Sequence, residues 1–157
     1  MPDFVSDVLN KKVSETEKPV PKPVGTYLVA VLAVPEKRDV QQRDGAQREV
    51  ITFKVKAMAA QADVDQEKLA DPKVGDLSAW PPRNYDIYGV DTPEGENRLK
   101  EFLVNILGLD PGDKTYAEIF SETPGKQFLA TFEHRPFTDK NTGQPEISWD
   151  IKSVAKV

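Results

Sequence analysis

The chain has 157 residues, of which 38% are hydrophobic and 30% charged, and its formal net charge is −5. This length suits one domain with its own core and is too short for two domains of ordinary size. The sequence contains no cysteine, which excludes a disulfide framework, a thiolate metal site and a cysteine nucleophile, and favours a reducing compartment such as the cytoplasm.

An acidic net charge would at first exclude a phosphate-binding protein, but the basic residues are unevenly distributed. Residues 36–57 contain six basic and four acidic side chains, and residues 123–157 contain five and four. Residues 93–122, in contrast, contain three basic and seven acidic side chains. Because a polyanion responds to the local field rather than to the total charge, the first two segments are candidate binding elements.

Residues 1–24 are expected to form a disordered arm, because four prolines, four lysines and four acidic residues leave few apolar groups to bury. Val5, Val8 and Leu9 fit either one short partner-docking turn or a solvated tail, and composition favours the tail. Asp3 and Asp7 lie where a secretory signal needs positive charge, and no later apolar run approaches the roughly 20 residues of a membrane span. We therefore expect neither export nor a membrane partner.

The domain is expected to span residues 25–157 and to begin with strands. An uncharged, β-branched run predicts a first strand over 26–34, and a polar stretch with a turn at Gly45 follows it over 36–47. Alternating side chains predict a half-buried second strand over 48–58. Residues 59–84 contain a short helical piece over 65–69, and the third strand is expected over 85–90.

The strongest helix signal lies between the third and fourth strands. Asp91, Thr92 and Pro93 make a capped helix start, the apolar residues up to Leu107 follow helical spacing, and Gly108 is placed to end the helix. A capping box over residues 115–118 predicts a second, short helix. The fourth strand is expected over 126–135 with Phe128, Ala130 and Phe132 inward, and the fifth over 146–154 with Ile147, Trp149 and Ile151 on one face.

This order predicts an all-β fold with one main helix, a five-stranded OB-type Greek-key barrel with its helix between strands three and four. The chain also resembles the OB-fold single-stranded DNA-binding proteins of bacteriophages over roughly residues 25–155. The features that carry this resemblance are the Gly25-Thr-Tyr opening of the first strand, the charged loop into the second strand that ends at Thr52-Phe-Lys-Val, the Glu96–Gly108 segment, and the Gly125-Lys-Gln-Phe-Leu-Ala strand with its following Asn and Gly turn.

The resemblance implies nonspecific capture of single-stranded DNA in phage replication or recombination, in the bacterial host cytoplasm. Further partners to test are phage or host replication proteins and a second copy of the chain in a homodimer. Many members of the family recruit partner enzymes through an acidic C-terminal tail, whereas this chain ends with two lysines among its last six residues. Tail-mediated recruitment is therefore not expected.

An OB barrel binds single strands with the face around strands two and three and with two loops, using cations for phosphates and aromatic rings for bases. The corresponding candidates are Lys37, Arg38, Arg43, Arg48, Lys54, Lys56, Trp80, Arg83, Tyr88, Arg135, Phe137 and Lys140.

Each candidate also has a structural interpretation. Arg38 and Arg43 lie beside Asp39 and Asp44 and can be solvated ion pairs. The strand lysines are equally well explained as ordinary polar-face residues. Core packing is favoured for Tyr85, Tyr88 and Trp149, and slightly favoured for Trp80, which would plug the barrel end. Base stacking is at least as well supported for Phe137, which lies in a polar loop.

No catalytic or cofactor motif is found in the sequence. His134 is the only histidine and has no accompanying nucleophile motif, the Asp139–Gly143 turn lacks the remaining ligands of a calcium loop, and no glycine pattern forms a phosphate loop. We therefore expect a non-enzymatic protein without metal or cofactor. The main alternative is a protein-binding module, either a virion component or a subunit docking to a host or phage enzyme through Glu94, Glu96 and Glu101. A metal-dependent nuclease is a distant third.

Overall fold

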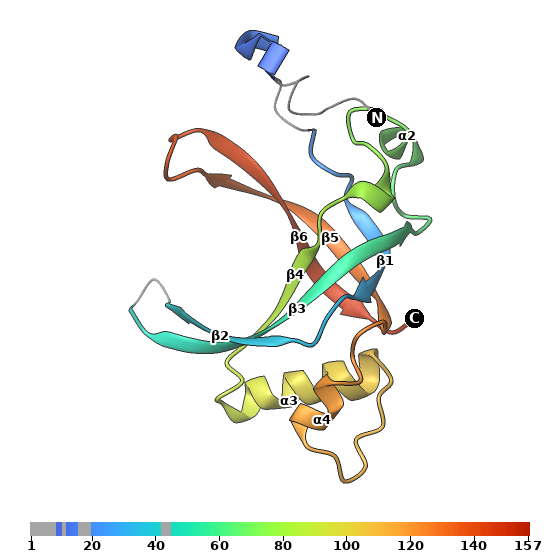
Figure 1. The fold of residues 1–157 in the computed structure, drawn as a ribbon, viewed down its shortest axis with the longest axis vertical. Coiled ribbons are helices and arrows are strands. Elements are labelled where there is room, and N and C mark those ends of the chain that lie inside the picture. Colours follow the sequence, from blue (N-terminus) through green and yellow to red (C-terminus); the bar gives the residue numbers. More distant parts are fainter. Residues whose placement is uncertain (1–8, 11, 16–19, 42–44) are drawn as a thin grey trace.

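The structure is a computed structural model that describes residues 9–10, 12–15, 20–41 and 45–157. The six strands form one antiparallel sheet, with short helices at its ends (Figure 1). The strands are β1 (Gly25–Val31), β2 (Glu36–Gln41), β3 (Gln47–Ala60), β4 (Arg83–Tyr88), β5 (Gln127–Thr138) and β6 (Pro145–Ala155). The helices are η1 (Val13–Glu15), α2 (Gln66–Leu69), η2 (Leu77–Ala79), α3 (Pro93–Glu101), the π-helical turn η3 (Phe102–Ile106) and α4 (Tyr116–Phe120).

The long strand β3 organises the sheet. One of its edges pairs first with β2 and then with β1, and the other edge pairs with β4. Strand β1 also pairs with β5, which pairs with β6. All of these pairings are antiparallel, and register shifts lie between Leu28 and Val29 and between Thr131 and Phe132. Such bulges bend a strand and increase its twist, which helps a single sheet to curl around a core.

The curled sheet does not close through a strand pairing between β4 and β6. Instead, the Arg83 guanidinium reaches across the opening: it donates a hydrogen bond of 2.7 Å to the Trp149 carbonyl and lies 3.6 Å from the Asp150 carboxylate. Of the expected five-stranded OB-type barrel, the structure thus shows a mostly β fold with one antiparallel sheet that is not closed.

The sheet has one strand more than the five expected, because β2 occupies part of the predicted polar loop. Its sequence, Glu-Lys-Arg-Asp-Val-Gln, has a single apolar residue and no alternation of polar and apolar side chains. Such a sequence can form a strand here because β2 lies at the sheet edge with most of its side chains exposed. The two hairpins β2–β3 and β5–β6 extend away from the core as two arms (Figure 1).

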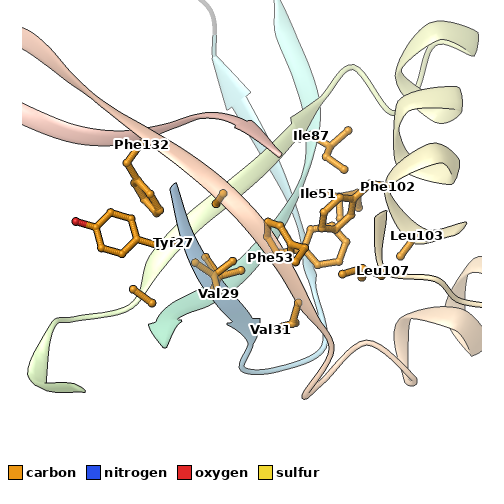
Figure 2. Packing of buried hydrophobic residues seen from close by; sticks show 14 of the residues in the cluster. Tyr27, Val29, Val31, Ile51, Phe53, Ile87, Phe102, Leu103, Leu107 and Phe132 are labelled. Carbon is orange, nitrogen blue, oxygen red and sulfur yellow. The ribbon is translucent and has the colours of Figure 1, made fainter. Parts of the chain in front are cut away.

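The core is rich in aromatic rings and lies inside the curled sheet. Tyr27 makes edge contacts with Trp80, Phe132 and Trp149, and the Phe132 and Trp149 rings stack with centroids 3.7 Å apart. Figure 2 shows Tyr27 and Phe132 at one end of this core, and Phe53 beside Phe102 at the other. The predicted inward side chains of β5 are buried as expected.

Helix α3 and the π-helical turn after it cover one end of the sheet. Thr92 caps α3 by accepting a hydrogen bond from the Gly95 amide, and Phe102 and Leu103 are buried against the core. The helix start and its buried face were predicted, but the last predicted turns are π-helical rather than α-helical. The Thr115 cap of α4 was also predicted.

The segment Val20–Val24 is attached to the sheet although the sequence placed it in the arm. The Pro23 carbonyl accepts hydrogen bonds from the Tyr27 hydroxyl at 2.8 Å and from the Trp149 indole at 3.0 Å. Val20 packs against the core. This segment therefore contacts the core, and the Pro23 carbonyl satisfies two buried donors. Most of the remaining predicted arm lies outside the described residues.

Candidate nucleic-acid interface

A groove runs between the two hairpin arms and past β4. It consists of three open clefts of about 710, 530 and 540 Å³ that share lining residues. Tyr88 and Arg135 line both the first and the second cleft, and Arg83 and Trp149 line both the second and the third. In the order of these volumes, we call them the near, middle and far clefts of the groove. The basic and aromatic side chains that define the groove are Arg48, Arg98, Tyr88, Arg135, Arg83, Phe137 and Lys22.

The near cleft is the most cationic part of the groove. Arg48 comes from β3, Arg98 from α3 and Arg135 from β5, and the described residues that line this cleft include no carboxylate. Three separate segments thus place positive charge around one opening, beside the exposed ring of Tyr88. Guanidinium groups present several donors in one plane, which suits phosphate oxygens.

A tight corner between β4 and α3 fixes Arg98 in this cleft. The Gly89 carbonyl accepts hydrogen bonds from the Thr92 amide and hydroxyl, and Gly95 packs so closely on it that an added Cβ would lie 1.8 Å from that oxygen. One turn later, the Arg98 guanidinium donates to the Tyr88 carbonyl at 2.7 Å. Only glycine at position 95 allows the helix to approach this corner.

In the middle cleft, two arginines contact the same carboxylate. Asp150 lies 2.9 Å from Arg135 Nε and 3.6 Å from Arg83, and it accepts a 2.5 Å hydrogen bond from the Ser148 hydroxyl. Asp86 and Glu133 also line this cleft. Its net charge is therefore not positive, and its main contribution is to orient two guanidinium groups that also face the neighbouring clefts.

Two exposed aromatic rings flank the groove. The Tyr88 residue is 45% exposed and Phe137 is 46% exposed. Burial and the neighbouring Asp86 carboxylate raise the pKa of Tyr88, so its hydroxyl stays protonated at neutral pH. Phe137 lies on the part of β5 that extends beyond the core, next to Ile147 in the far cleft. Exposed rings beside cations are the usual elements of a single-strand binding surface.

Arg38 lies on the outer face of the sheet in a fixed network. Its Nε donates to the Thr52 hydroxyl at 2.8 Å, its other nitrogen lies 3.2 Å from Asp86, and the Thr52 hydroxyl donates to Asp86 at 2.6 Å. These contacts connect β2, β3 and β4 just beside the groove. The predicted ion pair is thus present, but with Asp86 instead of Asp39.

Several predicted residues lie outside the groove. Lys37 forms an ion pair with Glu49 at 2.8 Å, and the bond to this carboxylate raises the pKa of Lys37. On the outward face of β3, Lys54 is exposed opposite Asn84 of β4, whereas Lys56 is half-buried opposite Ala30 of β1.

Trp80, a candidate stacking ring, is buried in the core. Trp80 is 4% exposed, packs on Tyr27 and Trp149, and donates to the Val74 carbonyl, so it cannot stack on a base. Lys140 is exposed in the turn between β5 and β6. Arg43 lies outside the described residues.

Sequence reasoning missed two cations that line the groove. Arg98 was not among the candidates, because nothing in its spacing shows that α3 turns it toward Tyr88. Lys22 was placed in the arm, where its proline neighbours gave no sign that the segment is attached to the sheet. The Gly89 and Gly95 pair was the signal available for a tight strand-to-helix corner.

Within the described part of the chain, no group of three or more histidine, cysteine or carboxylate side chains is arranged to hold a metal ion. None of the described helices combines the length and apolarity that crossing a membrane requires.

No protein-family model matches the sequence, and no curated protein matches it. The fold and the groove thus define a mostly β protein with a groove lined by basic and aromatic side chains.

Proposed function

We propose that this protein is an OB-type domain that binds single-stranded DNA in the groove, without catalysis and without sequence specificity. The observation that carries the proposal is the near cleft, where three arginines from three different segments face one opening and no carboxylate is found among the described residues that line it. Neutralising phosphates with such cations supplies most of the affinity in nonspecific nucleic-acid binding.

The pairing of the strands supports an OB-type assignment. Leaving β2 aside, the first strand pairs with the second and fourth, the second with the third, and the fourth with the fifth, while α3 lies between the third and fourth. An OB fold is a partly open Greek-key barrel that binds along its second and third strands and through two loops. The hairpins β2–β3 and β5–β6 occupy the positions of those two loops.

The shape of the groove favours a single strand over a duplex. Its walls are two hairpins, and the exposed rings of Tyr88 and Phe137 lie along it at separate positions. Aromatic rings stack on bases only where the bases are unpaired and free to turn outward, and such stacking is tolerant of sequence. We extend the proposal to a role in phage replication or recombination because the sequence resembles the single-stranded DNA-binding proteins of bacteriophages.

A charge-reversal pair tests the near cleft. In the Arg48→Glu/Arg135→Glu double variant, we expect a large loss of affinity for a fluorescein-labelled oligo(dT), measured by anisotropy over a range of salt. Losing two phosphate contacts should also reduce the slope of log K against log salt by about 1.4, since each contact to a single strand contributes about 0.7.

The matched control is Lys100→Glu/Lys126→Glu, which changes the net charge equally at two exposed lysines that do not line the groove. The proposal requires the control to keep nearly wild-type affinity and slope. Equal losses in both variants would mean that total charge, not the near cleft, governs binding. Absence of binding by the wild type at low salt would favour the protein-binding module instead.

A further inference from the structure

The wall of the far cleft is partly built by the segment Val20–Lys22, which belongs to no strand or helix. This segment is held in place at its C-terminal side by the two hydrogen bonds to the Pro23 carbonyl. The Lys22 carbonyl lies 2.6 Å from His134 Nε2 of β5, which must carry the proton because a carbonyl only accepts. The backbone that carries the Lys22 side chain is therefore fixed relative to the groove.

The Lys22 ammonium lies over two indole rings. It is 5.6 Å from the ring centroid of Trp80 and 6.0 Å from that of Trp149, and the Arg83 guanidinium lies 6.0 Å from the same Trp149 ring. No carboxylate among the described residues is within ion-pair distance of Lys22. Burial and the nearby Arg83 charge lower the pKa of Lys22.

The rest of the far cleft is apolar and aromatic. Phe137 and Ile147 expose about half of their surfaces beside it, and Pro21 and Pro145 complete the wall. Among the described residues that line this cleft, Glu146 is the one acidic residue, and Lys22 and Arg83 are the two cations. The volume of about 540 Å³ is within the range of about 300–1,000 Å³ typical of small-ligand sites.

We propose that the far cleft is a terminal nucleotide subsite, in which Lys22 and Arg83 bind a phosphate and Phe137 stacks on the base. This inference rests on the proposed function, because it extends the same DNA path beyond β4. It assigns a binding role to the segment before the first strand, where composition alone predicts only a tail. A phosphate would give the Lys22 ammonium the anionic partner that the described residues do not provide.

The position of Lys22 provides a specific readout. The protein has only two tryptophans, and the Lys22 ammonium lies over both of them. Movement of this charge toward a phosphate should therefore change the intrinsic fluorescence. We expect wild-type protein to show this change when a 12-nucleotide oligo(dT) binds at low salt.

The Lys22→Ala variant should still bind the 12-mer, but about tenfold more weakly, as expected for one lost charged contact. Its fluorescence change should be largely abolished, and its salt slope should be lower by about 0.7. Lys22→Arg, which keeps the charge, should restore most of the affinity. Lys100→Ala removes a lysine outside the groove and should behave as wild type. An unchanged melting temperature of Lys22→Ala would show that the fold is intact.

The two proposals fail in different ways. If wild type binds but Lys22→Ala matches it in affinity, salt slope and fluorescence change, the terminal subsite is wrong while DNA binding in the groove stands. If Lys22→Arg is as weak as Lys22→Ala, a phosphate contact by this side chain is also refuted. If wild type binds no oligonucleotide at low salt, both proposals fall together.

Discussion

Gly95 provides a sharp test of the corner that places Arg98 in the groove. In a helix, replacing glycine by alanine ordinarily stabilises a protein by up to about 1 kcal/mol, because alanine has the higher helix propensity. Here the added Cβ would lie 1.8 Å from the Gly89 oxygen and 2.2 Å from the Gly89 carbonyl carbon. Both are backbone atoms, so no side-chain rotation relieves the contact.

The start of α3 would have to move by about 1.5 Å before this contact reached ordinary van der Waals separation. That movement disturbs the Thr92 cap and the buried packing of Leu99. Overpacking and the weakened cap together predict that Gly95→Ala destabilises the fold by roughly 2–4 kcal/mol.

Urea unfolding followed by circular dichroism measures this difference, with Glu94→Ala as a control at the neighbouring exposed position. The control should change the free energy of unfolding by less than about 1 kcal/mol. The sign of the change in the free energy of unfolding distinguishes overpacking from the ordinary gain in helix propensity. A Gly95→Ala protein as stable as wild type, or more stable, would refute the close approach of α3 to Gly89.

Three further predictions concern the fold. Leu103→Ala should destabilise by roughly 2–5 kcal/mol, since this side chain is 1% exposed, and an effect no larger than that of Lys100→Ala in the same urea assay would contradict its burial. Deleting residues 1–19 should leave the melting temperature nearly unchanged. Deleting residues 1–24 should lower it clearly, because two buried donors would lose the Pro23 carbonyl. Equal melting temperatures of the two deletion variants would show that this carbonyl contributes nothing to stability. Asp63→Asn should lower the melting temperature at neutral pH, because hydrogen bonds from the Thr26 amide and hydroxyl hold the pKa of this carboxyl below its ordinary value of 3.8. The stabilisation is present above that ordinary value and is lost as the pH falls through the lower pKa of the folded state, so a difference from wild type that persists unchanged into strong acid would contradict this role.

Local signals in the sequence were sufficient for several elements. The caps of α3 and α4 were predictable because the side chains that accept the free amides are adjacent in sequence. The inward face of β5 followed from strict alternation, which burial on one face imposes. In contrast, β2 was missed because a highly charged edge strand buries almost nothing and carries no periodic signal.

The site was less predictable because it depends on contacts between distant segments. Arg135 could be suggested from its place in a basic hairpin, but its position beside Arg48 and Arg98 depends on how two hairpins and a helix meet. Trp80 and Phe137 both adjoin proline in the sequence, yet only the fold determines that one ring is buried and the other exposed. Exposure, and not residue type, distinguishes a core ring from a stacking ring.

The central claim is that the groove between the hairpins is the surface that binds single-stranded DNA. The most direct measurement is an NMR titration of the ¹⁵N-labelled wild-type protein with oligo(dT) at low salt. The account predicts that chemical-shift changes cluster on the backbone amides of Tyr88, Gly89 and Arg135, with smaller changes extending to Phe137. Absence of shifts, or shifts concentrated around Glu96 and Tyr116 on the opposite side of α3, would contradict it.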